Sequence, residues 1–246
     1  MSMKGRAFAA AIGATAMLSA GAVSAQEAGD MVLGAGWLGF YPQDSSKPLT
    51  FTSPVNREVP GSGSAVSNAH TLGLSFTYHF SPRWAVEAVV GIPPKFKLDG
   101  EGTLAGVGRI GEASQYSPTL LARYTFLDNT SRIRPYVAAG GTYVWYDDVK
   151  LTSNLQNTLG AGIGAPPGAT STSAKLDAKF APVLNAGASY QIDNRWSVAL
   201  SLSYVKLKTK AKLTTRSNAS NATVATSESS LTLDPIVSFL SLNYKF

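Results

Sequence analysis

The chain has 246 residues, of which 44% are hydrophobic and 15% charged, and its formal net charge is +6. A basic excess this small, spread along the whole chain, does not indicate a nucleic-acid-binding protein. The sequence has no cysteine, which excludes a disulfide scaffold and any thiolate chemistry.

Residues 1–25 have the features of a secretory signal peptide. Lys4 and Arg6 precede an alanine-rich apolar segment, and small residues lead up to a cleavage site after Ala25. The segment is too short, and too often interrupted by glycine and serine, to be a membrane helix. We therefore expect a signal peptide at 1–25 and one mature domain at 26–246. That domain carries a net charge of +4, because cleavage removes two of the 21 basic residues and no acidic one.

The rest of the chain has no apolar run near the roughly 20 residues that a membrane helix needs. It contains instead segments in which apolar and polar residues alternate, the period of a β-strand with one apolar face. Eight strands are expected, over residues 31–41, 71–80, 84–92, 115–126, 133–147, 180–192, 196–210 and 231–246.

The connections between these strands alternate in length. Tight turns at 81–83, 127–132 and 193–195 separate long connections that are rich in glycine, proline, serine or threonine. The long connections are 42–68, 93–111, 148–177 and 211–230, the third with a short helix expected over 155–163. In lipid, only a closed barrel leaves no strand backbone unpaired. The pattern predicts an all-β fold, a closed eight-stranded antiparallel transmembrane β-barrel with long extracellular loops, short periplasmic turns and both termini in the periplasm.

The alternative is a soluble lipocalin-like barrel, which would point its apolar face inward. The aromatic residues favour the membrane barrel. Phe80, Trp84 and Trp196 adjoin the short turns, whereas Tyr41 and Tyr204 lie near the long connections. Aromatic residues at both ends of an apolar band are typical of the two membrane interfaces.

The last segment, 231–246, has an aromatic terminal residue. Phe246 follows Tyr244, Leu242 and Leu240 at alternate positions, so all four share one strand face. This arrangement resembles the terminal strand by which the barrel-assembly machinery recognises bacterial outer-membrane proteins. It implies the outer membrane of a Gram-negative bacterium as the location, and that machinery as a partner.

Four stretches resemble one family. They are residues 86–93, LAGVGRIGEASQYSPTLLARYTF (104–126), RPYVAAGGTY (134–143) and LDPIVSFLSLNYKF (233–246). Together they are similar to the OmpW family of small outer-membrane β-barrels, which includes AlkL-like hydrophobic-uptake proteins. The likeness covers most of the mature chain and is weakest in 43–68 and 152–174. It implies a porin-like passive conduit that takes small hydrophobic molecules past lipopolysaccharide and releases them sideways into the bilayer.

Strand alternation also assigns the side chains that face the lumen. A barrel of eight strands has room for side chains or one small ligand, not for a water-filled pore. Near the periplasmic end we expect a closed polar floor, in which Glu87 pairs with one of two arginines. Its residues are His79, Glu87, Arg123, Arg134, Asn243 and Lys245.

The inward residues of the extracellular half are apolar and predict a hydrophobic lumen. They are Leu38, Phe40, Val89, Leu121, Val144, Val237 and Phe239, and for any one of them packing is the alternative to ligand contact. The family resemblance implies two narrowing positions, Val89 and Phe180. Alternation agrees for Val89 but places Phe180 outward, unless Pro182 shifts the register.

Two further patterns each leave two interpretations open. Prolines within the expected strands are either breaks in the barrel wall or strand ends above the membrane. They are Pro118, Pro135, Pro182 and Pro235. An outward row of lysines either faces lipopolysaccharide phosphates or is a solvated strand extension. It consists of Lys206, Lys208, Lys210 and Lys212.

Two other functions compete with transport. A structural or adhesive barrel would fill its lumen at every level and act through its loops. A lipid-modifying enzyme would need a base beside a nucleophilic hydroxyl, and neither His70 nor His79 lies in a nucleophile motif. We therefore expect no catalytic residue, no metal and no cofactor.

Overall fold

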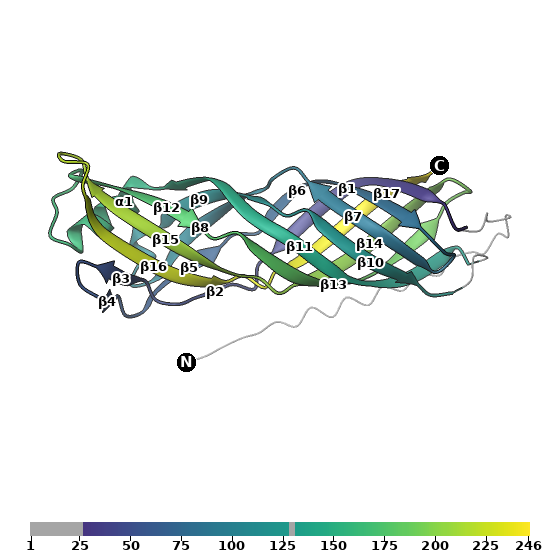
Figure 1. Ribbon diagram of the computed structural model, residues 1–246, viewed down its shortest axis with the longest axis horizontal. Coiled ribbons are helices and arrows are strands. Elements are labelled where there is room, and N and C mark those ends of the chain that lie inside the picture. Colours follow the sequence, from purple (N-terminus) through teal and green to yellow (C-terminus); the bar gives the residue numbers. More distant parts are fainter. Residues whose placement is uncertain (1–26, 128–130) are drawn as a thin grey trace.

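The computed structural model describes residues 27–127 and 131–246. The signal peptide expected at 1–25 and the centre of the turn at 127–132 lie outside the described residues. The described chain forms one long β-structure, with the C-terminus at one end and the helix α1 near the other (Figure 1).

Eight strands form a closed antiparallel barrel, as the alternation predicted. The ring runs β1–β6–β7–β10–β11–β13–β14–β17 and closes where β17 pairs with β1. The strands are β1 (Met31–Tyr41), β6 (Ala69–His79), β7 (Trp84–Gly91), β10 (Thr119–Thr125), β11 (Ile133–Leu151), β13 (Lys179–Gln191), β14 (Trp196–Val205) and β17 (Ile236–Lys245). The start of β1 and the end of β17 lie together at the end with the short turns, where the Phe246 amide donates to the Met31 carbonyl over 3.0 Å.

The long connections are not loops, which corrects the sequence interpretation. They form β2 (Ser45–Ser46), β3 (Thr50–Ser53), β4 (Arg57–Glu58), β5 (Ser62–Val66), β8 (Lys95–Gly102), β9 (Arg109–Tyr116), β12 (Thr170–Leu176), β15 (Lys208–Ser217) and β16 (Thr223–Thr232), with a 3₁₀ turn at Ala105–Val107. Pairing β11–β9–β8–β5 makes one sheet, and β12–β15–β16–β3–β4 makes a second, with β2 on β16. The barrel wall therefore continues well beyond the membrane band, as Figure 1 shows at the end with α1.

Three expected strands are cut in the structure, and proline explains two of the cuts; the third, in the expected strand 196–210, falls at Lys206-Leu207 between β14 and β15 and has no proline. The expected strand 115–126 is divided between β9 and β10 at Ser117-Pro118, and the expected strand 231–246 is divided between β16 and β17 at Pro235. Proline has no amide hydrogen to donate to a strand ladder, so both positions end a run of pairing.

The helix α1 (Ser153–Ala161) begins two residues before the expected start. Thr152 caps it, because its side chain accepts a hydrogen bond from the Leu155 amide. Leu155 and Leu159 are buried in a cluster with Phe51, Ile110 and Leu213, so α1 seals the far end of the extension. Among the described residues, no helix is long and apolar enough to cross a membrane.

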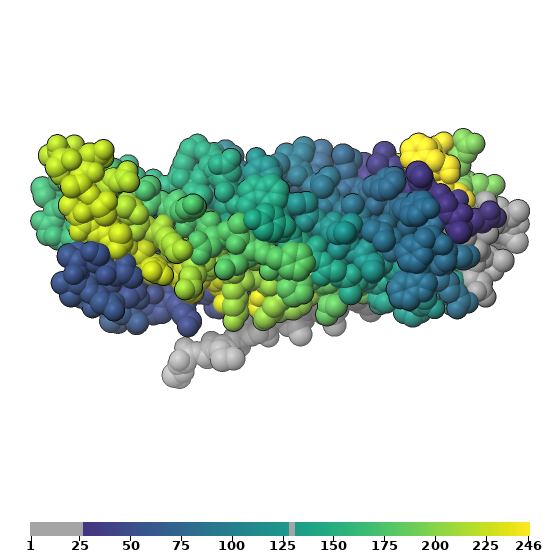
Figure 2. Space-filling model, in the orientation of Figure 1, coloured from purple at the N-terminus to yellow at the C-terminus, as the bar shows by residue number. Residues whose placement is uncertain are grey.

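The barrel surface is apolar and its interior is polar near the short turns. Large outward side chains that are well exposed include Leu72, Leu74, Leu120, Leu184, Leu200, Leu202, Leu240 and Leu242. Aromatic side chains flank this band on both sides: Phe80, Trp84, Phe126, Tyr190 and Trp196 at one edge, and Trp37, Tyr41, Tyr143 and Tyr204 at the other. A soluble barrel would bury such an apolar band in its interior, so the outward apolar surface of this barrel must lie in a lipid bilayer. Figure 2 shows the barrel and its extension as one elongated body.

Candidate functional site

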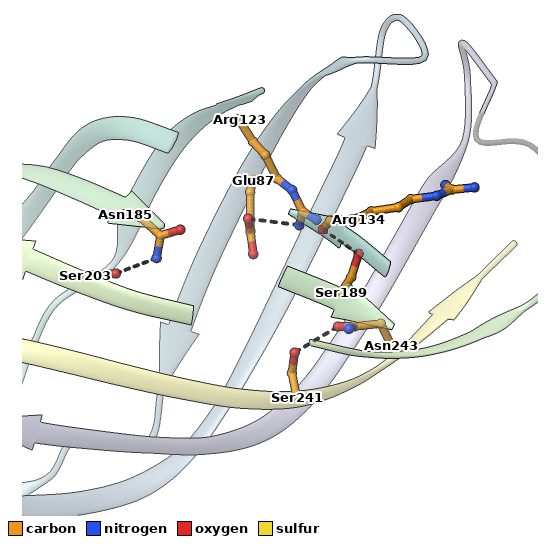
Figure 3. Close-up of polar contacts among 8 residues, drawn as sticks. All are labelled: Glu87, Arg123, Arg134, Asn185, Ser189, Ser203, Ser241 and Asn243. Carbon is orange, nitrogen blue, oxygen red and sulfur yellow. Dashed lines mark hydrogen bonds and ion pairs between the residues drawn. The ribbon is translucent and has the colours of Figure 1, made fainter. Parts of the chain in front are cut away.

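All seven residues assigned to the hydrophobic lumen by alternation line one cavity. This lower chamber has a volume of about 70 Å³ and contacts Leu38, Phe40, Val89, Leu121, Val144, Val237 and Phe239. Its polar residues are partly satisfied within the protein. The Asn185 amide donates to the Ser203 hydroxyl over 2.8 Å (Figure 3), and the Thr142 hydroxyl donates to the Pro118 carbonyl over 3.0 Å. The chamber is lined mainly by apolar residues, together with eight polar ones that include Glu87 of the floor.

Phe180 lies on the outer surface, so the lumenal position implied by the family resemblance is wrong. Its side chain is 72% exposed. The ladder between β11 and β13 runs without a bulge through Tyr143 opposite Phe180 and Gly141 opposite Pro182. Because Pro182 shifts no register, the outward position given by alternation holds.

The polar floor is built around one buried ion pair. Arg123 Nη1 lies 3.5 Å from Glu87 Oε2, and each side chain is only 9% exposed (Figure 3). The Arg123 guanidinium also lies 3.5 Å from the centroid of the Tyr136 ring, a contact that stabilises a desolvated cation. Arg134 is buried nearby, and its Nε donates to the Ser131 carbonyl over 3.3 Å. Of the two arginines that could pair with Glu87, the structure selects Arg123.

Asp30 completes the floor and was missed by the sequence analysis. It precedes β1, outside the expected strands, so alternation assigned it no face. Its carboxylate lies 3.3 Å from Lys245 Nζ, and its carbonyl accepts from the His79 amide over 2.9 Å. Asp30 therefore ties the start of β1 to both β17 and β6.

Little free space remains in the floor. The cavity among His79, Glu87, Arg123, Tyr136 and Asn243 has a volume of about 20 Å³. That is room for roughly one water molecule. The barrel is closed to larger molecules at this level.

Above the lower chamber, two more cavities lead toward the extracellular end. A neck of about 30 Å³ shares Phe40, Gln115 and Pro235 with the lower chamber. An upper chamber of about 90 Å³ in the extension shares Leu98 and Leu231, among others, with the neck. The sequence analysis missed the upper chamber because its walls come from segments that were expected to be loops.

The wall of the lower chamber is incomplete between β7 and β10. Their ladder ends at Val89 opposite Thr119, and the next backbone bond runs from the Gln115 amide to the Pro94 carbonyl at 3.1 Å. Between these points, no backbone hydrogen bond joins 90–93 to 116–118 among the described residues. Neither Pro94 nor Pro118 has an amide hydrogen to donate. Val90, Gly91, Pro94, Ser117 and Thr119 line the chamber at this gap.

The other strand prolines do not open the wall. The Lys206 amide donates to the Pro182 carbonyl, and the Val205 amide donates to the Pro235 carbonyl, each over 3.1 Å. Pro135 lies within β11, and its carbonyl accepts from the Phe126 amide over 2.9 Å. The Pro118 carbonyl likewise accepts from the Tyr143 amide of β11 over 3.1 Å, but residues 116–118 have no backbone bond to β7 among the described residues, so of the four candidate breaks only Pro118 borders a gap.

Comparison with known protein families identifies the family of this chain. The sequence profile of the OmpW family matches residues 27–246, a range that includes every described residue. The chain belongs to the OmpW family.

Three relatives illustrate how far the likeness extends. Outer membrane protein W of Vibrio cholerae serotype O1 is 28% identical over 232 residues, covering 94% of this chain and 95% of that protein. The dibenzothiophene metabolism operon protein PahQ of Pseudomonas aeruginosa is 28% identical over 190 residues, covering 77% of this chain and 78% of that protein. The crystal structure of outer membrane protein OprG from Pseudomonas aeruginosa superposes with a TM-score of 0.77 at 26% identity, covering 91% of this chain and 99% of that one.

This OmpW-family barrel is therefore an outer-membrane protein, as its surface already required. Its relatives are named outer-membrane proteins, and the matching solved structure is an outer-membrane barrel. The apolar band faces lipid, the short turns face the periplasm, and the extension carries the three-cavity column outward.

The two histidines of this OmpW-family protein have different surroundings. His70, at the outer rim, accepts a hydrogen bond from Trp37 Nε1 over 3.3 Å and stacks on that ring. His79 is 1% exposed in the floor. Among the described residues, neither histidine is hydrogen-bonded through its ring to a hydroxyl, and no group of three or more His, Cys, Asp or Glu is placed to hold a metal ion.

Proposed function

We propose that this protein is a passive conduit for small hydrophobic molecules. They enter from outside, occupy the upper and lower chambers, and leave sideways into the bilayer. The observation that carries the proposal is the column of largely apolar cavities ending above a closed, charged floor. Removing the apolar surface of such a ligand from water is favourable in the chambers, and more favourable in the lipid beyond the barrel wall.

Passage into the periplasm is unfavourable for such a ligand. It would have to displace the Glu87–Arg123 pair, whose buried charges would then lack partners or water. The gap between β7 and β10 offers the alternative exit. Val90 supports this assignment, since it lines the lower chamber and is 49% exposed on the outer surface.

The name of one relative supports a hydrophobic cargo. The dibenzothiophene operon protein is named for the metabolism of an apolar aromatic compound. We expect no chemical change of the cargo and no cofactor. A purely adhesive barrel remains the competing function, and uptake measurements separate the two.

We propose that the row of four lysines formed by Lys206 and by Lys208, Lys210 and Lys212 of β15 contacts lipopolysaccharide in the outer leaflet. Lys208 and Lys210 are exposed directly above Tyr204 of the outer aromatic edge. Lys206 and Lys212 lie on the same face and have carboxylate partners at 2.6 Å and 3.3 Å. Replacing Lys208 and Lys210 by serine should reduce the lipopolysaccharide that copurifies with the barrel. Unchanged copurification would refute the contact.

Two further proposals concern assembly. The mature protein begins at residue 26, after the signal peptide is removed. β17, which closes the ring against β1 and carries outward Leu240 and Leu242, is the strand engaged by the barrel-assembly machinery.

Uptake of a labelled alkane by cells producing the protein tests the conduit. Val89→Trp should fill the lower chamber at the lower edge of the gap and slow uptake, because Val89 lines the chamber. The matched control is Val86→Trp, which adds the same bulk on the lipid face of the same strand. Equal rates for both variants and the parent, or no uptake above cells lacking the protein, would leave the adhesive barrel as the better account.

A further inference from the structure

The neck between the two chambers contains three polar side chains, Gln115, Tyr146 and Thr209, in an otherwise apolar surface. Its apolar lining includes Phe40 and Phe96, whose rings meet edge to face at 5.9 Å. Gln115 and Tyr146 also line it. They are directly opposite each other in the β9–β11 ladder, so their side chains lie next to each other on the inner face.

Neither polar group is satisfied by the protein. The Tyr146 hydroxyl is buried without a hydrogen-bond partner among the described residues. Gln115, a residue only 5% exposed, also makes no side-chain hydrogen bond among the described residues, although of the two groups only the Tyr146 hydroxyl is fully buried. The other polar residue of the neck, Thr209, donates its hydroxyl to the Asp177 carbonyl over 2.8 Å. An unpaired buried polar group is costly, so the buried Tyr146 hydroxyl, beside a second unpaired side chain at the same level of a ligand path, indicates a partner from outside the chain.

The neck limits what that partner can be. Its volume of about 30 Å³ suits one small polar group or one water molecule. No charged side chain lines the cavity. A carboxylate or an ammonium group would lose its hydration there without gaining an ion pair. A neutral hydroxyl can donate to the Gln115 carbonyl oxygen and accept from the Tyr146 hydroxyl.

We propose that the neck is a recognition site for the hydroxyl group of an otherwise apolar ligand, an aliphatic alcohol or a phenol. The apolar part of that ligand occupies the chamber above or below, and the hydroxyl pairs with Gln115 and Tyr146. This inference rests on the proposed conduit and specifies its ligand class. The protein then takes up alcohols in preference to both alkanes and fatty acids of the same length.

Initial uptake rates of labelled 1-dodecanol, n-dodecane and dodecanoate test the proposal, each corrected for cells without the protein. We expect 1-dodecanol to be fastest. Tyr146→Phe and Gln115→Leu should each lower the alcohol-to-alkane ratio about fivefold, the effect of one hydrogen bond, without slowing n-dodecane. Tyr143→Phe is the matched control, because Tyr143 lies on the outward face of the same strand.

The outcomes separate this site from the conduit itself. Failure to take up n-dodecane refutes the conduit. Uptake of n-dodecane with an alcohol-to-alkane ratio that Tyr146→Phe leaves unchanged refutes the recognition site alone. Dodecanoate uptake as fast as that of 1-dodecanol contradicts the neutral ligand class.

A structural measurement gives a second readout. In the refolded full-length protein in lipid nanodiscs, the side-chain amide resonances of Gln115 should shift on addition of 1-dodecanol but not n-dodecane. Resonances that respond to neither probe would mean that the neck holds water only, which overturns the proposal.

Discussion

The floor and the lower chamber are lined by the inward faces of the same barrel strands, yet the floor is filled and the chamber is not. In the floor, inward residues are charged and hold one another, as Glu87 holds Arg123 and Asp30 holds Lys245. In the lower chamber they are mainly aliphatic or aromatic and leave about 70 Å³ unfilled. Paired buried charges make a rigid barrier, because separating them exposes each to a poor environment. The apolar side chains of the lower chamber need no partner, so a hydrophobic ligand can occupy the unfilled volume without separating any pair.

The largest expected effect on stability comes from removing the ion pair of the floor. Glu87→Ala leaves the Arg123 guanidinium buried without its carboxylate, which should lower the free energy of unfolding by about 3–5 kcal/mol. Urea unfolding in detergent micelles measures it. Glu101→Ala, on exposed β8, is the control and should change little. A Glu87→Ala barrel as stable as the parent would show that the floor does not depend on this pair.

A smaller effect is expected from making the chamber resemble the floor. Val89→Arg places a cation in the lower chamber, where the one carboxylate of the lining, Glu87, already pairs with Arg123. The variant should reduce alkane uptake about tenfold, because the charge keeps water in the path. Val89→Leu keeps the site apolar and should retain most of the rate. If both variants transported equally, the apolar character of the chamber would not matter for uptake.

The smallest effect concerns the rim above the chamber, where Asp234 bonds Lys206 and the Leu207 amide. Burial opposes ionisation of Asp234, but these hydrogen bonds outweigh it and hold its pKa below the ordinary value. A depressed pKa contributes stability above the ordinary carboxyl range, and that contribution is lost as pH falls through the folded-state value. Asp234→Asn should therefore unfold at lower urea than the parent at neutral pH, and the difference should vanish in strong acid. A difference that persisted there would assign the effect to packing.

Alternation within the sequence determined the eight strands of the barrel, their facing and the inward residues that they contribute to the floor and the lower chamber. Successive side chains of a strand point to opposite faces, so the face of each residue follows from the strand's own sequence and does not depend on which strand pairs with it. This is why Val89, Val144 and Glu87 were placed correctly. It is also why alternation was right for Phe180 where the family resemblance was not.

Only the tertiary structure decided which strands meet and where they fail to meet. The pairing of Tyr146 with Gln115, and of Lys245 with Asp30, depends on register between segments far apart in the chain. The four strand prolines look alike in sequence. Only Pro118 borders a gap. Its carbonyl accepts from the Tyr143 amide of β11 over 3.1 Å, as the carbonyls of the others accept from a neighbouring strand or turn, but no backbone bond joins residues 116–118 to β7 on the other side among the described residues. The sequence of the extension is rich in turn-forming residues, so its strands form through pairing across the two sheets rather than through local propensity.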